Sequence, residues 1–123
     1  MKNYKLILQY DGTRYSGWQK QGNTDNTIQA KLETIASKLT GVPTDVNGSG
    51  RTDAGVHAFG QVANFRCEES ALPPRFLRSE ETVTDLIRDY FNNALPMDVR
   101  VLSVSEAPAP FTTILTFSIF FPA

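Results

Sequence analysis

The sequence is poor in residues that form disulfides or bind metals. Among 123 residues there is one cysteine, Cys67, and one histidine, His57. A single cysteine excludes a disulfide within the chain and a zinc site built from several thiolates, and it suits a reducing compartment. With so few thiolate and imidazole ligands, most transition-metal sites are excluded too. We therefore expect no metal site.

Long hydrophobic segments are also missing. No run approaches the ~20 apolar residues that a membrane-spanning helix needs, and the opening Met-Lys-Asn-Tyr does not begin the apolar core of a signal peptide. Hydrophobic residues make up 41% of the chain and charged residues 20%, which is typical of a globular domain and argues against disorder. The composition predicts one small cytoplasmic domain with no membrane partner.

Charge is distributed unevenly along the chain, although the formal net charge is only −1. Residues 1–66 carry eight basic and five acidic side chains, a charge of +3, and residues 67–123 carry four basic and eight acidic ones, a charge of −4. The glycine-rich segments lie in the basic half, so a polyanion, if one binds, is expected to bind there. A surface charge with no binding role explains the same imbalance.

The first half of the chain predicts a strand followed by a helix. Residues 3–10 alternate in polarity, which is the period of a half-buried strand. Asn26 is a suitable N-cap for a helix, and Gly41 is a suitable residue to end it. The apolar face of this helix consists of Ile28, Leu32, Ile35, Ala36 and Leu39.

The second half predicts more strands and another helix. Residues 44–47 are expected to be a short extended segment, residues 62–67 an alternating strand, and residues 99–104 the last strand. Pro73-Pro74 predicts a linker, and Ser79 is expected to cap a helix. The apolar face of that helix consists of Val83, Leu86, Ile87, Tyr90 and Phe91.

This order of elements predicts the fold class. The sequence β-α-β-β-α-β is that of the ferredoxin-like split βαβ, an α+β fold. It would contain a four-stranded antiparallel sheet with both helices on one face. The other face of the sheet would then be left to be covered by something else.

A glycine-rich segment at residues 48–55 fits three familiar loop types poorly. An EF-hand calcium loop starting at Asp45 would need glutamate at its twelfth position, which is Val56. A serine hydrolase using Ser49, Asp53 and His57 would need a Gly-x-Ser-x-Gly elbow, and the order of residues here differs. A Walker phosphate loop would need Gly-Lys-Ser/Thr, which is absent.

Two interpretations of the segment stay open from the residues alone. Glycines and aspartate suit a tight connection between strands. However, Arg51 and Asp53 are two residues apart, so on extended backbone their side chains point the same way. A guanidinium beside a carboxylate favours its ionised form, and glycines let a ligand approach the backbone. Such a carboxylate could act as a base or nucleophile on a phosphate-bearing substrate.

Residues 50–58, Gly-Arg-Thr-Asp-Ala-Gly-Val-His-Ala, resemble the signature loop of the A-type tRNA pseudouridine synthases, which isomerise uridine in the anticodon stem-loop. The resemblance covers roughly residues 3–111. Flanking segments that also match in order and spacing are Tyr10-Asp11-Gly12, Ser16-Gly17-Trp18-Gln19, Thr27-Ile28-Gln29, Gln61–Phe65, and Asn92–Pro96 followed by Asp98-Val99.

The resemblance implies the chemistry of the site. The expected activity is isomerisation of uridines at about positions 38 to 40 of tRNA, without a metal or an organic cofactor. Asp53 matches the aspartate that attacks or deprotonates the nucleotide during cleavage of the glycosidic bond, before the uracil rotates and is rejoined through carbon. Arg51 matches the arginine that pairs with this aspartate and helps to extrude the nucleotide. A salt bridge that only holds the loop is the alternative for Arg51.

Further contacts to tRNA are expected from the signature segment and from the loop after the first strand. Basic side chains there would contact phosphates, which position RNA without reading its sequence. A core position is the alternative for Trp18, and a solvated surface is the alternative for each basic residue. His57 and Cys67 are expected to be structural. The candidate substrate-binding residues are Thr52, Gly55, Trp18, Gln19, Lys20 and Arg14, with Lys5 as a further phosphate contact.

The end of the chain departs from the family, whose members are about twice as long and consist of two similar halves. Residues 1–111 resemble the first half with its catalytic loop. Residues 112–123 contain no Arg, Lys, His or Tyr, and residues 114–121 are apolar and prone to form a strand. We expect this tail to pair with a sheet edge or with another chain, giving self-association or a homodimer.

Because the second half is missing, we expect the chain on its own to be weakly active or inactive. The alternative function, from a different class, is a non-catalytic RNA-binding ferredoxin-like module. Such a module would display several aromatic residues on its sheet. Residues 61–67 contain a single aromatic residue, Phe65.

Overall fold

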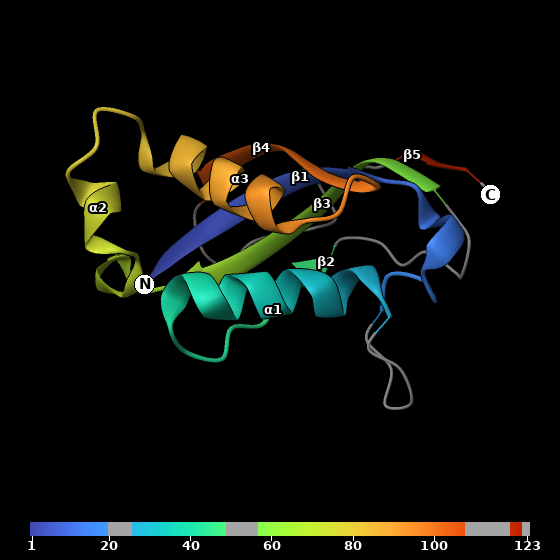
Figure 1. Ribbon diagram of the computed structural model, residues 1–123, viewed down its shortest axis with the longest axis horizontal. Coiled ribbons are helices and arrows are strands. Elements are labelled where there is room, and N and C mark those ends of the chain that lie inside the picture. Colours follow the sequence, from blue (N-terminus) through green and yellow to red (C-terminus); the bar gives the residue numbers. More distant parts are fainter. Residues whose placement is uncertain (20–25, 49–56, 108–118, 122–123) are drawn as a thin grey trace.

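Two helices lie on one face of an antiparallel sheet in the computed structural model (Figure 1). The structure describes residues 1–19, 26–48, 57–107 and 119–121. Strands β1 (Lys2–Tyr10), β2 (Asn47–Gly48), β3 (His57–Cys67) and β4 (Val99–Ala107) follow the spatial order β2-β3-β1-β4, and each neighbouring pair is antiparallel. Helix α1 (Ile28–Thr40) connects β1 to β2, and α3 (Val83–Ala94) lies between β3 and β4. The predicted ferredoxin-like α+β fold is confirmed.

Both helices begin at a threonine, not at the residues predicted to cap them. Thr27 caps α1 and accepts a hydrogen bond from the backbone N–H of Ala30 at 3.2 Å, because the Asn26 amide instead donates to the carbonyl of Arg14 at 2.6 Å. Thr82 caps α3, whereas the Ser79 hydroxyl accepts from the N–H of Glu81 in a turn ahead of the helix. Gly41 ends α1 with a φ of 77°, as predicted.

Three further boundaries differ from the prediction. The extended segment expected at 44–47 forms ladder pairs only at β2, Asn47–Gly48. Strand β3 begins at His57, five residues early, because a bulge opposite Leu8 and Gln9 keeps it paired with β1 as far as Tyr10. The expected linker contains a 3₁₀ turn, η2 (Glu69–Ala71), and a short helix, α2 (Pro74–Leu77). Proline suits the first helical position, and Phe76 is buried, which anchors this turn.

The core lies between the sheet and the two long helices. On β1 the predicted alternation is confirmed, since Tyr4, Leu6, Leu8 and Tyr10 are all buried. Phe65 on β3 meets Phe91 on α3 with ring centroids 5.8 Å apart. Cys67, at the end of β3, is 4% exposed, and burial raises the pKa of its thiol. The prediction that Cys67 is a buried strand residue is confirmed.

The tail forms a short strand against the sheet. β5 (Ile119–Phe121) pairs antiparallel with His57–Phe59 of β3, on the edge of β3 that faces away from β1. For the described residues, the expectation that the tail pairs with a sheet edge is confirmed. Within the described part of the chain, no helix is both long and apolar enough to cross a membrane.

Candidate active site

Most of the signature segment, residues 50–58, lies outside the described residues. Residues 49–56 lie outside the described residues, and with them the predicted catalytic pair Asp53 and Arg51. Three of the candidate substrate-binding residues, Thr52, Gly55 and Lys20, also lie outside. Gly48 on one side and His57 on the other are described, so the structure shows how each end of the segment is held.

The upstream end is held by helix α1. The Gln29 side-chain amide donates to the carbonyl of Val46 at 2.9 Å, and the N–H of Val46 donates to a carboxylate oxygen of Glu33 at 3.0 Å. Val46 is fully buried. Two residues later, Gly48 pairs with Ala63 of β3. The chain therefore enters the signature segment from a position fixed by both the helix and the sheet.

Trp18 belongs to the core beneath this end of the segment. Its side chain is 2% exposed and stacks on Tyr10 with ring centroids 6.5 Å apart. A Cβ added at Gly48 would lie 2.5 Å from Cε2 of Trp18, closer than real contacts allow. The burial supports the core alternative for Trp18, since a ring with so little accessible surface cannot stack on a base without moving. Gln19, the next residue, is exposed.

The downstream end is held by His57, the first residue of β3. The backbone N–H of Gly12 donates to Nδ1 of His57 at 2.9 Å, and an oxygen of Asp11 lies 3.1 Å from the same nitrogen. The N–H of Asp11 in turn donates to the carbonyl of Asp98 at 2.9 Å. The end of β1 and the starts of β3 and β4 are thus joined at one point.

Asp11 is the charged member of this junction. Its carboxylate accepts hydrogen bonds from the hydroxyl and the backbone N–H of Thr13, which lower the pKa of Asp11, and the nearby His57 and Arg14 lower it further. The carboxylate therefore stays ionised well into the acidic range. It also caps the 3₁₀ turn η1 (Gly12–Arg14) that follows β1.

Arg14, a candidate phosphate contact, pairs with a carboxylate in the structure. Its Nε and Nη2 donate to Oδ2 of Asp98 at 3.0 and 2.7 Å, while the Tyr15 hydroxyl donates to Oδ1 at 2.8 Å. The Asp98 side chain is only 14% exposed, but that of Arg14 is 72% exposed. The ion pair offsets part of the positive charge that a phosphate would meet. The main role of Arg14 in the structure is therefore to connect η1 to Asp98, the residue before β4.

These hydrogen bonds decide the protonation state of Asp98. Burial alone would raise its pKa, but the hydrogen bonds from Tyr15 and Arg14 outweigh burial, so the pKa of Asp98 is lowered overall. Burial and the same carboxylate raise the pKa of Tyr15. Both groups therefore keep their hydrogen-bonded forms, a carboxylate and a neutral phenol, at neutral pH.

Asp98→Asn is expected to lower the free energy of unfolding at pH 7 by about 1–3 kcal/mol, the usual cost of losing hydrogen bonds to a charged group. Because the folded-state pKa is lowered, this stabilisation is present above the unfolded pKa of about 4 and disappears as pH falls through the folded value. Urea unfolding at pH 7 and near pH 3 measures both effects.

The matched control for this variant is Asp89→Asn on α3. Asp89 pairs with the neighbouring Arg88 but is half exposed, so its replacement should change stability by no more than about 0.5 kcal/mol. An Asp98→Asn variant that is as stable as this control at pH 7 would show that the hydrogen bonds of Asp98 contribute nothing to stability.

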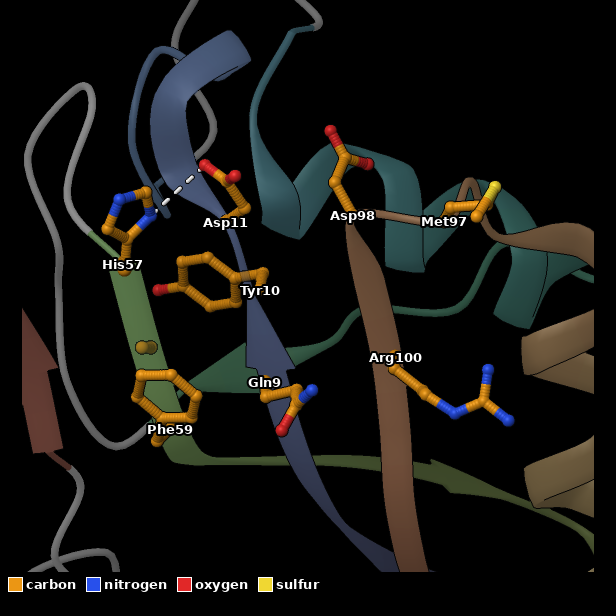
Figure 2. Close-up of a pocket in the computed structure, with 9 residues that line it drawn as sticks. Gln9, Tyr10, Asp11, His57, Phe59, Met97, Asp98 and Arg100 are labelled. Carbon is orange, nitrogen blue, oxygen red and sulfur yellow. Dashed lines mark ion pairs between the residues drawn. The ribbon is translucent and has the colours of Figure 1, made fainter. Parts of the chain in front are cut away.

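A cavity of about 360 Å³ opens at this junction (Figure 2). It lies where β1 ends and where β3 and β4 begin, directly beside the downstream end of the signature segment. Its walls combine apolar surface from the half-exposed Phe59 and from Met97 with the Gln9 amide and two carboxylates. The lining residues are Gln9, Tyr10, Asp11, His57, Ala58, Phe59, Met97, Asp98 and Arg100.

Sequence reasoning missed several residues of this cavity. Phe59 was overlooked because β3 was expected to begin at residue 62. Its register opposite Gln9 places it on the face of the sheet away from the helices. Asp98 was noted only as part of a matching segment. Its position directly before a predicted strand, together with a basic residue in the loop after β1, was the available signal.

The comparisons with known proteins agree with this architecture. Residues 6–109 match the family described as tRNA pseudouridine synthase. A tRNA pseudouridine synthase A from Bacillus sp. (strain KSM-64) is 48% identical over 111 residues, which cover 90% of this chain and 41% of that protein. A tRNA pseudouridine synthase A 2 from Bacillus thuringiensis subsp. konkukian (strain 97-27) is 45% identical over 106 residues, or 86% of this chain and 39% of that protein.

A stretch of higher identity occurs with a protein from Clostridium tetani (strain Massachusetts / E88), named tRNA pseudouridine synthase A 1. It is 63% identical over 65 residues, which cover 53% of this chain and 26% of that protein. The family match spans most of the chain, so the chain belongs to the tRNA pseudouridine synthase family. It spans about two fifths of the length of the Bacillus relatives that it matches.

Proposed function

We propose that this chain provides the catalytic-loop part of an enzyme that isomerises uridine to pseudouridine in tRNA. The observation that carries the proposal is the pair of anchors around residues 49–56. Gly48 pairs with Ala63 of β3 and lies against the ring of Trp18, and His57 accepts a hydrogen bond from the loop after β1. The residues on both sides of the segment that carries the family signature are therefore held by the sheet.

Asp53 is the proposed catalytic residue, and Arg51 its partner. Asp53 lies four residues before His57, so covalent geometry limits its Cα to within about 14 Å of the Cα of His57. That range includes the cavity beside His57, where Phe59 and Met97 offer apolar surface and Gln9 an amide. An ionised carboxylate next to a guanidinium is suited to attack on, or proton removal from, the nucleotide.

Finer features of the function are part of the same proposal. By the resemblance of residues 50–58, the substrate is the anticodon stem-loop of tRNA, and the enzyme acts in the cytoplasm as a homodimer. Thr52, Gly55, Gln19 and Lys20 are the proposed substrate contacts. Extrusion of the uridine costs a few kcal/mol of stacking, which contacts from an inserted side chain and a pocket offset.

The proposal is tested by measuring pseudouridine formation in a tRNA transcript. Two proteins are compared: the 123-residue chain, and a chimera in which residues 1–109 are followed by the remaining part of the relative from Bacillus sp. (strain KSM-64). We expect turnover by the chimera and little or none by the chain alone, because the chain spans 41% of that relative. A folded chimera that binds tRNA without forming pseudouridine would favour the non-catalytic RNA-binding module instead.

Self-association has its own measurement. Light scattering on the 123-residue chain should give a mass above that of a monomer and rising with concentration, because residues 113–121 are apolar and prone to form strands. A monomer at all concentrations would show that the tail pairs with β3 of its own chain and does not pair with a second chain.

A further inference from the structure

His57 lines the cavity, but the proposed chemistry gives its ring no role. It is the first residue of β3 and, at the same time, the contact between the signature segment and the loop after β1. Its side chain is 27% exposed, so it is neither a plain core residue nor a fully solvated one. Figure 2 shows the ring above the start of β3, with Nδ1 turned toward Asp11.

Two groups compete for the same ring nitrogen. Nδ1 lies 2.9 Å from the N–H of Gly12, which donates to it, and 3.1 Å from Oδ1 of Asp11. A ring nitrogen carries either a lone pair or a proton in the plane of the ring. With a lone pair, Nδ1 accepts from Gly12. With a proton, it donates to Asp11, and Gly12 loses its acceptor.

The loss matters because Gly12 is buried. A buried N–H without a partner is unfavourable, so the loop after β1 has to shift, or admit water, when the acceptor is lost. Asp11 is ready to accept the proton-bearing ring, since the bonds from Thr13 keep its carboxylate ionised.

Among the described residues, Asp11 is the charged group that lies next to Nδ1 of His57. Asp98, at the start of β4, also lines the cavity, but both its oxygens accept from Arg14 and Tyr15. Figure 2 shows Arg100 of β4 pointing away from His57. The segment of β5 that pairs beside His57, Ile119–Phe121, contains no titratable residue.

We propose that His57 is a positioning residue whose Nδ1, by accepting from the N–H of Gly12, clamps the downstream end of the signature segment to the loop after β1. The clamp acts on catalysis through Asp53, four residues upstream, and in this respect it rests on the proposed function. The clamp itself is a property of residues 11, 12 and 57.

Two substitutions separate the clamp from a general packing role. His57→Asn places Oδ1 where Nδ1 stands, so it keeps the acceptor for Gly12. His57→Leu places a methyl group there and removes the acceptor, while its size remains similar. Circular dichroism and thermal melting show first that each 123-residue variant is folded.

Hydrogen exchange of the Gly12 amide reads the clamp directly. After correction for intrinsic exchange, we expect the Gly12 amide to be at least about 10-fold more protected in the wild type and in His57→Asn than in His57→Leu. Equal protection of Gly12 in the wild type and in a folded His57→Leu variant would overturn the clamp, as would loss of protection in a folded His57→Asn variant. If His57→Leu does not fold, the comparison of the wild type with His57→Asn decides alone.

The effect on catalysis is measured in the chimera. We expect His57→Asn to retain turnover and His57→Leu to lower kcat by at least about 10-fold with little change in KM. Turnover that is the same in all three proteins would remove the link to Asp53, even where exchange shows the clamp. A chimera without any activity would count against the proposed function, and the exchange data would still decide on the clamp.

Discussion

Asp53→Asn is expected to reduce pseudouridine formation by the chimera by at least about 100-fold while tRNA binding is retained. The lower limit is the contribution usual for a positioned acid–base group, and loss of a nucleophile would cost more. The amide keeps the size of the side chain but has neither the charge nor the nucleophilic oxygen. Single-turnover conversion of a tRNA transcript, together with a filter-binding measurement, separates the chemical step from affinity.

The matched control is Asp45→Asn, eight residues upstream. Asp45 is another aspartate in the chain between α1 and β3. It is exposed, and it precedes the anchor at Gly48. Its replacement should leave turnover and binding unchanged. Equal activity of the Asp53→Asn variant and this control would exclude Asp53 from the reaction and leave the RNA-binding module as the better description.

Trp18→Ala is expected to lower the free energy of unfolding by about 3–5 kcal/mol, the range for removing a large buried aromatic side chain. The indole is 2% exposed, stacks on Tyr10 and fills the space directly under Gly48. Its removal leaves a cavity at the point where the chain enters the signature segment. Urea unfolding followed by far-UV circular dichroism measures the loss.

Two related variants distinguish packing from contact with RNA. Gly48→Ala introduces a Cβ that meets the indole at 2.5 Å, so on its own it should cost about 1–3 kcal/mol. In a Trp18→Leu background this cost should shrink, because the ring that the Cβ meets is gone. A Trp18→Ala variant that keeps its stability and loses only tRNA affinity would show that Trp18 contacts RNA and does not stabilise the core.

The fold could be predicted because its periodic signals are local. β1 alternates cleanly, and the apolar faces of α1 and α3 recur at helical spacing, so type and order of the elements follow from neighbours in sequence. A predicted helix N-cap was wrong where the expected residue makes a hydrogen bond elsewhere, as Asn26 does by donating to the carbonyl of Arg14. The early start of β3 depends on its partner strand, which a single segment does not reveal.

The candidate site also combines features that the sequence predicts with features that depend on distant contacts. The signature was recognised because its residues are consecutive, and it identified Asp53 and Arg51 without any structure. The groups that hold the segment in place are distant in sequence: His57 meets Gly12 across 45 positions, and Asp98 meets Arg14 across 84. Such pairings arise from the order of strands in the sheet, because that order brings the end of β1 next to the starts of β3 and β4.

Cys67 supplies a reporter for all these variants. The thiol is 4% exposed, the sequence contains no other, and burial disfavours its reactive thiolate. An alkylating reagent should therefore modify the chain only when β3 separates from β1 at the end remote from His57. The labelling rate, followed by mass spectrometry, would give the frequency of that opening without a dye or an engineered tag, and would show whether changes around Gly12 and Gly48 loosen the whole sheet or only its far end.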